Sequence, residues 1–240
     1  MNREGLTIEE VGAVVRVRID AGPGNLFTPA MTARLAGLLN EPPDGAHVVH
    51  LSASGSEFCM GRVPFREGAG LLREDVAGLA GVVEALERTP LVTVAEVQGD
   101  AAGFGVGLVA LSDVAVAVED ACLSFPEVDA GFAPALVLAW LGELVGRRQA
   151  FWLAATGVRL PAGEARDAGL LTDVVRDRSE LATATAAAIE LLCTKPQRVH
   201  AQIKELLRLY AAVPAERRSG IASDRLAFGA LQRALAETGR

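Results

Sequence analysis

GDAAGFGVGLVALSDVAVAVEDACLSFPE, residues 99–127, is the stretch that decides the fold. It combines a glycine-rich turn, a short apolar helix and a hydrophobic strand, and it ends in a carboxylate after a Phe-Pro step. Three glycines, Gly103, Gly105 and Gly107, leave the backbone open at the start of the helix, where free N–H groups favour negative charge. The stretch therefore predicts a cradle for an anion or an oxyanion, with Glu127 as the acid or base beside it.

Three alternatives compete with an oxyanion cradle as the role of these glycines. A dinucleotide-binding fingerprint needs glycine at its first, third and sixth positions, and the sixth position counted from Gly103 is Leu108. A phosphate loop of the Walker type needs a lysine and a hydroxyl residue after the glycines, and neither follows. Close packing of a helix on a sheet accounts for the glycines without any chemistry, and the sequence leaves that alternative open.

Length and composition limit the class of protein. The chain has 240 residues, of which 50% are hydrophobic, so it can bury one large core. Its net charge of −7 argues against a general nucleic-acid-binding protein. The N-terminal residues lack an apolar signal core and no apolar run approaches the length of a membrane span, so we expect a cytoplasmic protein without membrane contacts. Cys59, Cys122 and Cys193 are widely spaced, which predicts buried free thiols and no metal site.

Predicted strands and helices alternate along the chain on both sides of the glycine turn. Thr28 followed by Pro29 is typical of a helix start, and continuous apolar runs are typical of buried parallel strands. Upstream we expect a hairpin over 6–19, helices over 29–41 and 73–88, and strands over 47–51 and 91–97. Downstream we expect helices over 131–144, 147–155 and 162–168, a strand over 170–175, and helices over 180–193, 197–211 and 214–237. This order predicts βαβ winding and an α/β core.

With these elements in place, the chain resembles the crotonase superfamily, the group of enoyl-CoA hydratases and isomerases, over about residues 14–175. The motifs that carry the resemblance are PGNLFTPAM (23–31), SEFCMGR (56–62), GDAAGFGVG (99–107), DVAVA (113–117), FPEVDAGFAP (125–134) and GRRQAFWLAATGVRLPAGEARDAGLLTDVV (146–175). The resemblance implies a spiral of ββα units with a helical C-terminal appendage. We expect a core over 1–178 and a helical region over 179–240 that makes oligomer contacts in a homotrimer or homohexamer.

The resemblance also implies a substrate and a site. The substrate is a thioester of CoA or of an acyl carrier, and no cofactor is needed beyond the CoA that the substrate carries. Backbone N–H groups of Arg62 and Phe104 form the implied oxyanion hole, and Glu127 transfers the proton. The remaining implied substrate-binding residues are Gly61, Gly103, Gly105, Gly107, Phe132 and Pro134.

Two departures from the family pattern affect the predicted reaction. Hydratases of the family typically carry a second glutamate four residues after the turn glycine, and this chain has Gly107 there. Moving a double bond needs only one carboxylate that shuttles one proton, so a Δ3,Δ2-enoyl-CoA isomerase is favoured over a hydratase or dehydratase. A thioester hydrolase, a decarboxylase and a non-catalytic acyl-CoA binder stay open as alternatives. Many members also carry an aspartate in the loop between the strand over 47–51 and the helix over 73–88, called the first loop below. This chain has Arg62 and Val63 at that point.

Several other side chains carry possible chemistry, each with a structural alternative. Arg62, Arg66 and Arg73 either bind CoA phosphates or form a solvated face. Asp129 is either a second acid or a residue of a surface turn, and we expect the turn. We expect His47, His50, His200 and Cys59 to be structural. The aromatic residues either line an acyl pocket or fill the core, and we expect the core for Phe132, Trp140, Phe151 and Trp152.

Overall fold

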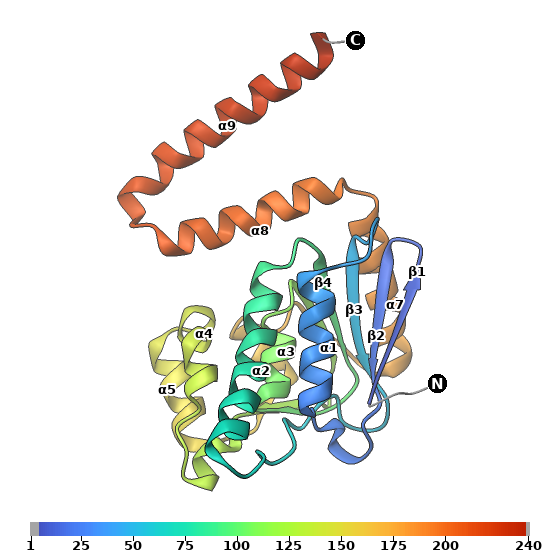
Figure 1. Cartoon of the computed structure of the whole chain (residues 1–240), viewed down its shortest axis with the longest axis vertical. Coiled ribbons are helices and arrows are strands. Elements are labelled where there is room, and N and C mark those ends of the chain that lie inside the picture. The colour runs from blue at the N-terminus through green and yellow to red at the C-terminus, as the bar shows by residue number, and fades with distance from the viewer. Residues whose placement is uncertain (1–4, 239–240) are drawn as a thin grey trace.

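The computed structural model describes the backbone of residues 5–238 and the side chains of residues 5–230. Two sheets form the centre of the fold, and helices cover both faces of the larger one (Figure 1). The larger sheet has the order β1-β2-β3-β4-β6-β9 and the smaller one the order β5-β7-β8. The strands are β1 (Leu6–Val11), β2 (Val14–Ile19), β3 (Val48–Ala53), β4 (Val92–Val97), β5 (Ala101–Ala102), β6 (Val114–Val118), β7 (Cys122–Ser124), β8 (Leu160–Pro161) and β9 (Asp173–Val175).

The helices follow the predicted order along the chain. They are α1 (Pro29–Asn40), α2 (Ala69–Arg88), α3 (Phe104–Ala110), α4 (Ala135–Val145), α5 (Arg147–Thr156), α6 (Ala162–Asp167), α7 (Arg178–Cys193), α8 (Gln197–Ala212) and α9 (Ala215–Thr238), with the 3-10 turns η1 (Pro23–Asn25) and η2 (Pro126–Ala130). The predicted start of α1 is confirmed, because the Thr28 hydroxyl accepts the N–H of Met31 at 3.2 Å and Pro29 is the first helical residue.

The larger sheet is wound as the strand–helix–strand order predicts. β1 and β2 form the predicted antiparallel hairpin, with Val11 opposite Val14. Every later pairing in this sheet is parallel, with Val15 beside Val49 and Val49 beside Thr93. Parallel strands covered on both faces need apolar side chains on both sides, which explains the continuous valine-rich runs.

Two layers of helices use alternate residues of the same strands. Val15, Val49 and Ala95 face the main core, which is completed by buried residues of α1 and α2. Val48, Val92 and Val94 point to the opposite face and pack against Ile189, Leu192 and Cys193 of α7. This alternation follows from the two-residue period of a strand, and it fixes α1 and α2 on one side of the sheet and α7 on the other.

The three C-terminal helices do not behave alike. α7 lies against the larger sheet and buries Leu181 and Thr185, whereas α8 crosses one end of the molecule and α9 projects away from it (Figure 1). α7 therefore acts as the second covering layer of the sheet. The division into a core over 1–178 and an oligomer-contact region over 179–240 stays a prediction.

α2 begins at Ala69, four residues before its predicted start, and two other boundaries are moved by local turns. The helix expected from residue 131 begins at Ala135, because the preceding η2 turn ends at Gly131, whose φ of +76° breaks the helical path. The strand expected over 170–175 is confined to Asp173–Val175, because the N–H of Leu170 closes α6 by donating to the carbonyl of Ala165. In both cases a local hydrogen-bonded turn takes residues from the neighbouring element.

Polar side chains attach α8 to the ends of the strands. Gln197 donates to the carbonyl of Ala46 at 2.6 Å, and Lys204 donates to the carbonyl of Leu91 at 2.8 Å. Between them on the same helical stripe, the ring nitrogens of His200 and His47 lie 2.9 Å apart. One imidazole must donate to the other, so this contact requires at least one neutral histidine.

Acidification is expected to destabilise the fold through His47. Burial and the neighbouring His200 lower the pKa of His47 below its ordinary 6.5. As the pH falls, His47 is therefore protonated near pH 6.5 in the unfolded chain but only at a lower pH in the folded one. The free energy of unfolding decreases as the pH falls from 7.5 through 6.5, and it levels off below the folded-state pKa. Thermal melts across this range are expected to show a smaller decrease for His47→Gln than for the wild type. An unchanged pH dependence in this variant would contradict the assignment.

Candidate active site

Three segments that are distant in sequence meet beside the smaller sheet. Cys59, in the loop after β3, forms a bridge with Ala101, and the N–H of Ala102 donates to the carbonyl of Cys59 at 2.9 Å. On the other side, the N–H of Gly103 donates to the carbonyl of Ser124 at 2.9 Å. The glycine turn is thus held between the first loop and the strand that leads to Glu127.

Two of the glycines are required by close approach, for different reasons. A Cβ on Gly105 would lie 2.0 Å from the carbonyl oxygen of Cys59, so only glycine lets α3 pack on the first loop. A Cβ on Gly103 would lie 2.7 Å from Glu127 Oε1, and Gly103 also has a φ of +50°. Gly105 therefore fits the packing alternative, whereas Gly103 makes room for the carboxylate. Gly61, with a φ of +107°, lies close to the carbonyl of Ala102.

The two residues whose backbone N–H groups are predicted as the oxyanion hole, Arg62 and Phe104, both contact Phe27. Phe27 pairs with the first loop through bonds of 3.0 Å to Gly61 and Val63, which turns the Arg62 N–H away from Phe27. The Phe104 ring packs edge-on against the Phe27 ring at 5.2 Å, and Phe104 is the first residue of α3. Among residues 5–238, no protein acceptor takes either N–H. Both donors are therefore available to a ligand, and their role as an oxyanion hole stays a prediction.

Glu127 carries the carboxylate nearest to the glycine turn. It lies in the η2 turn, half-buried, with Oε1 against Gly103. Its Oε2 is buried and has no hydrogen-bond partner in the described part of the chain. Burial raises the pKa of Glu127, and its own backbone N–H and the charge of Arg62 oppose that shift. A buried carboxylate with a raised pKa and a free oxygen is suited to accept a proton from a bound substrate.

No second carboxylate joins Glu127 from the positions that the sequence pointed to. A Cβ on Gly107 would lie 3.7 Å from Trp140 Cζ2, and the Trp140 side chain is buried. An indole therefore lies where a glutamate at position 107 would point. The carboxylate of Asp129 lies beside Gly157, not Gly103, and the residue is exposed, which agrees with the expected surface turn.

The arginines of the first loop differ in their surroundings. Arg66 is tied to Asp75 through its side chain and backbone N–H and also pairs with Glu74 at 3.3 Å. Arg62 is half-buried, stacks on Phe65 with its Cζ 3.1 Å from the ring centroid, and is not paired in this way. Beside them is a hollow of about 10 Å³, room for about one water, lined in part by Arg62 and Asp75.

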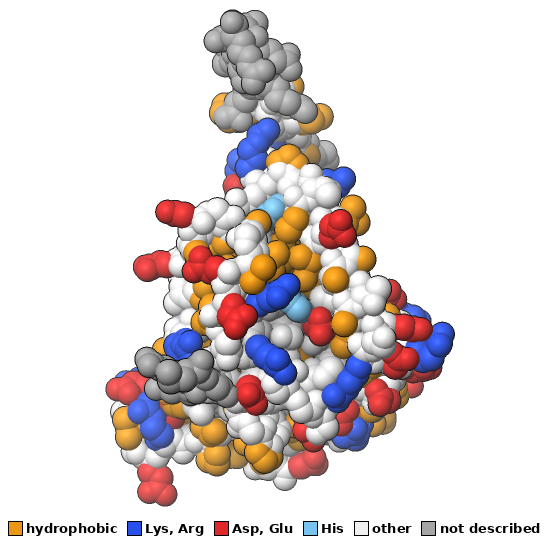
Figure 2. Space-filling model, turned by 90° about the vertical axis from the view of Figure 1, so that its right-hand side faces the viewer, with side chains coloured by type: hydrophobic (Ala, Val, Ile, Leu, Met, Phe, Trp, Pro, Cys, Tyr) orange, Lys and Arg blue, Asp and Glu red, His pale blue; other side chains and the backbone are white. Residues whose placement is uncertain are grey.

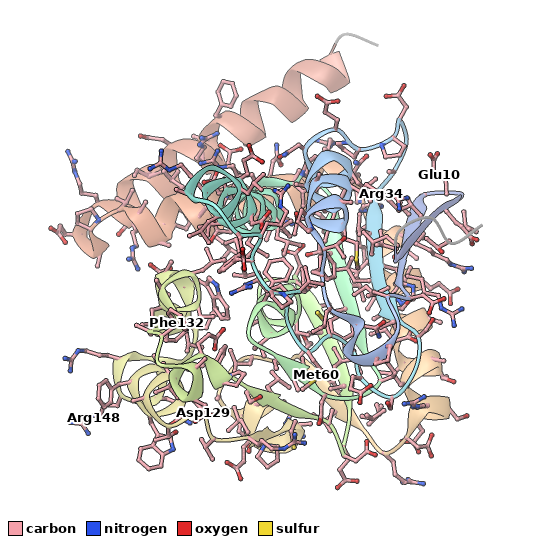
Figure 3. All side chains as sticks on the ribbon, turned by 60° about the horizontal axis from the view of Figure 1, so that its bottom comes forward. Glu10, Arg34, Met60, Asp129, Phe132 and Arg148 are labelled. Atoms are coloured by element: carbon pink, nitrogen blue, oxygen red, sulfur yellow. The ribbon has the colours of Figure 1, made fainter. Side chains whose placement is uncertain are left out.

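The expectation that the aromatic residues fill the core is wrong for three of the four. Trp140 is 5% exposed, but Phe132, Phe151 and Trp152 are 70%, 72% and 57% exposed. These three lie on the lobe formed by η2, α4 and α5, where Figure 3 places Phe132, Asp129 and Arg148 away from the sheet. The lobe turns this side of its helices outward, which helical spacing alone does not reveal. The substrate-binding roles of Phe132 and Pro134 stay predictions.

The histidines and Cys59 have structural partners away from the carboxylate. His50 contacts Glu96 at 3.0 Å on the face covered by α7, and His47 contacts His200. Cys59 is fully buried, and burial raises the pKa of its thiol to about 12, so it is an inert packing residue. All three cysteines are free, although only Cys59 is fully buried.

A larger hollow of about 440 Å³ lies between the sheet and α7 and contains none of the predicted site residues. Figure 2 looks onto this side of the molecule, where hydrophobic side chains lie among basic and acidic ones. Its lining is formed by Val14, Arg16, His50, Glu96, Ala182, Ala186, Ile189, Glu190 and Cys193. Within the described ranges, no three His, Cys, Asp or Glu side chains are grouped to hold a metal ion, and no helix is long and apolar enough to cross a membrane.

Two features of the site were missed by sequence reasoning. The approach of Trp140 to Gly107 joins residues 33 positions apart on different helices, and no local pattern marks it. The second is Asp75, a buried acid at the N-terminal end of the buried face of α2, whose other buried residues are apolar. A carboxylate at a core position needs a cationic partner. Its place in the helical pattern could therefore have marked Asp75, with the nearby arginines as candidate partners.

Gly103→Ala is expected to reduce proton transfer more than stability. The added Cβ displaces the Glu127 carboxylate by several tenths of an ångström, and misplacement of a catalytic group by about 1 Å costs about a hundredfold in rate. Gly146→Ala is the matched control, because Gly146 also has a positive φ, +77°, but open space at its Cβ. Both variants are compared by thermal melt and by exchange of the α-protons of an acyl-CoA into deuterated water. Equal exchange rates in the two variants would contradict the role of the Gly103–Glu127 contact.

Comparison with known proteins agrees with this arrangement. The family model described as enoyl-CoA hydratase/isomerase matches residues 9–234. A putative enoyl-CoA hydratase of Thermus thermophilus is 32% identical over 191 residues, which cover 76% of this chain and 75% of that protein. The peroxisomal Δ(3,5)-Δ(2,4)-dienoyl-CoA isomerase of Arabidopsis thaliana is 30% identical over 159 residues, which cover 60% of this chain and only 57% of that protein.

Solved structures share the whole architecture. A putative enoyl-CoA hydratase of Thermobifida fusca in complex with CoA is 26% identical and superposes with a TM-score of 0.86, covering 98% of this chain and 95% of that one. An enoyl-CoA hydratase of Mycobacterium smegmatis is 25% identical, with a TM-score of 0.87 over 95% of this chain and 91% of that one. Since the family model spans nearly the whole sequence and the fold matches these structures, the chain belongs to the enoyl-CoA hydratase/isomerase family of the crotonase superfamily.

Proposed function

We propose that this protein shifts the double bond of an enoyl thioester from the Δ3 to the Δ2 position, with Glu127 as its single proton-transferring residue. The observation that carries the proposal is the isolation of Glu127: its carboxylate lies against Gly103, while position 107 faces Trp140 and Asp129 lies beside Gly157. Adding water to a double bond needs a group that orients the water and a group that moves the proton. A double-bond shift needs only the second.

The proposed mechanism uses the donors and the acceptor described above. The thioester carbonyl accepts hydrogen bonds from the N–H groups of Arg62 and Phe104, and Glu127 removes a proton from C2 of the 3-enoyl group. The electron pair of that C–H bond enters the conjugated system, and the negative charge is shared with the carbonyl oxygen. Glu127 then returns its proton to C4, which leaves the C2–C3 double bond. Preorganised donors of this kind each contribute about 3–4 kcal/mol at the transition state.

A hydratase is the second candidate, and the names of relatives favour it. The Thermus thermophilus relative and both structural neighbours are called hydratases, whereas the Arabidopsis thaliana relative is called an isomerase. Hydration by this chain would leave Glu127 to activate water alone, because Gly107 offers no side chain. A hydrolase, a decarboxylase or a non-catalytic binder has no comparable observation in its favour.

The reaction is tested by giving the protein 3-hexenoyl-CoA and 2-butenoyl-CoA in parallel. We expect the 3-enoyl substrate to become conjugated and the 2-enoyl substrate to gain water at least about a hundredfold more slowly. Faster hydration than isomerisation would replace the first proposal by the second, and release of free CoA would indicate a hydrolase. Binding without any turnover of either thioester would leave a non-catalytic binder.

The proposal also includes the thioester carrier, the oligomeric state, the cellular location and the cofactor requirement. The CoA present in the Thermobifida fusca structure supports a CoA thioester as the substrate. The choice between CoA and an acyl carrier, the homotrimer or homohexamer, the cytoplasmic location and the lack of a separate cofactor stay predictions.

A further inference from the structure

The guanidinium of Arg62 has an open hydrogen-bonding edge. Its Nη1 donates to the carbonyl of Val63 at 2.9 Å, and the Phe65 ring covers one of its faces. In the part of the chain that the structure describes, Nε and Nη2 have no protein acceptor, and no carboxylate lies within ion-pair distance of Arg62. Nε and Nη2 together form the fork with which arginine binds a carboxylate through two parallel hydrogen bonds.

Arg66, in the same loop, is an arginine whose guanidinium has carboxylate partners. Its Nε donates to Asp75 at 2.8 Å, its backbone N–H donates to the same carboxylate at 2.9 Å, and Glu74 lies at 3.3 Å. Asp75 also acts on Arg62 from a greater distance, but its hydrogen bonds are taken up by Arg66. The Nε–Nη2 edge of Arg62 is therefore available to a ligand, whereas Asp75 and Glu74 already occupy the guanidinium of Arg66.

The position of Arg62 indicates which part of a substrate it meets. Its backbone N–H is one of the two donors proposed for the thioester carbonyl, so its side chain starts beside the first carbons of the acyl group. Arg62 belongs to the first loop, which pairs through Cys59 with the turn that contacts Glu127, and the charges of Arg62 and Glu127 act on each other. The phosphates of CoA are separated from the thioester by the whole pantetheine arm, which is longer than an arginine side chain.

We propose that the Nε–Nη2 edge of Arg62 binds a carboxylate at the far end of a short acyl group, so that the preferred substrates are thioesters of dicarboxylic acids. The Phe65 ring holds the guanidinium in place, and the bond to Val63 fixes its rotation, which leaves the fork preoriented. This inference rests on the proposed function for the location of the thioester. It adds a substrate class that a neutral enoyl group would not satisfy.

The test measures the binding of saturated thioesters, which requires no turnover. Glutaryl and pentanoyl groups both have five carbons, and only the glutaryl group ends in a carboxylate. Each is offered on CoA and on pantetheine, and binding is measured by calorimetry. We expect the wild type to bind the glutaryl thioester about tenfold more tightly, or better, on either carrier, because a charge-assisted bidentate contact contributes at least that factor.

Three variants separate the charge of Arg62 from its shape. Arg62→Met keeps a long side chain without charge and is expected to bind both acyl groups equally. Arg62→Lys keeps the charge without the fork and is expected to retain part of the preference. Arg73→Met is the matched control, since Arg73 is an exposed arginine of α2, and it is expected to keep the wild-type ratio. Thermal melts establish that each variant is folded.

Every outcome of this experiment decides. Equal binding of the two acyl groups by the wild type, or an unchanged preference in Arg62→Met, overturns the proposal. So does a loss in Arg62→Met that is equal for both acyl groups on CoA and absent on pantetheine, because the guanidinium would then bind a CoA phosphate. α-Proton exchange of glutaryl-CoA and of pentanoyl-CoA is measured beside binding. Exchange without a glutaryl preference overturns only this inference, a glutaryl preference without exchange overturns only the proposed function, and no binding of any thioester overturns both.

Discussion

Replacing Glu127 with glutamine is expected to abolish α-proton exchange while leaving the fold intact. The amide cannot accept the proton, and removing a general base of this kind costs about 10² to 10⁴ in rate. The melting temperature should equal or exceed that of the wild type, because within the described residues Glu127 Oε2 is buried without a hydrogen-bond partner and Glu127 forms no ion pair. A residue that served only to hold the structure together would show the opposite pattern.

Asp129→Asn is the matched control for this experiment. Asp129 also lies in η2, two residues further along, but it is exposed and its carboxylate faces Gly157. This variant is expected to exchange α-protons at the wild-type rate. If Glu127→Gln kept exchange within a few-fold of the wild type, or if Asp129→Asn lost it, the assignment of the base would be wrong.

The pH dependence of exchange gives an independent reading of the same group. Burial raises the pKa of Glu127 above its ordinary 4.5, so kcat/KM should decrease on the acid side as the pH falls through that raised value and the carboxylate becomes protonated. The charge of Arg62 lowers the pKa of Glu127, so Arg62→Met should move this acid-side decrease in kcat/KM to higher pH. An acid limb in the wild type at or below 4.5 would show that the carboxylate is not in the buried setting described.

Gly105→Ala is expected to lower the melting temperature more than any of the other glycine-to-alanine substitutions. In an isolated helix this change is favourable by about 1 kcal/mol. Here the new Cβ lies 2.0 Å from the carbonyl oxygen of Cys59, and neither backbone can give way without breaking the contact between α3 and the first loop. Overpacking of this kind costs about 3 kcal/mol, which lowers the melting temperature by about 10 °C.

Gly81→Ala provides the comparison that isolates the clash. Gly81 lies inside α2 and has open space at its Cβ, so the same substitution is expected to raise the melting temperature slightly through helix propensity alone. The two variants are measured by thermal and urea denaturation. A stable Gly105→Ala protein would mean that α3 and the first loop can separate, and the predicted oxyanion hole would then lack its scaffold.

The sequence predicts local features of this protein well because local chemistry sets them. The Thr28–Pro29 start of α1 depends on neighbours within one turn, and the valine-rich strands show their burial directly in their composition. The glycines of the turn indicate that other atoms approach their backbone closely. The glycines do not reveal which atoms these are. In the structure, Cys59 approaches Gly105 and Glu127 approaches Gly103.

Features that depend on the packing of distant elements are not visible in the sequence. Helical spacing in α5 does not reveal that Phe151 and Trp152 face outward, because the direction of the lobe is set by its contacts with the rest of the fold. The same holds for Trp140 opposite Gly107 and for the side chain of Arg62, whose open edge depends on where Phe65 and Asp75 lie.

The strand order of the larger sheet bears on how the chain is made. Its spatial order, β1-β2-β3-β4-β6-β9, is also its order along the chain, so each strand joins an edge that earlier residues have already built. A nascent chain that leaves the ribosome N-terminus first can therefore add strands as they emerge, with an unpaired edge exposed at every stage. The first edge is protected from the start, because β1 carries the exposed charges of Glu9 and Glu10. The advancing edge is closed last, by the three residues of β9, whose shortness leaves little for another chain to pair with.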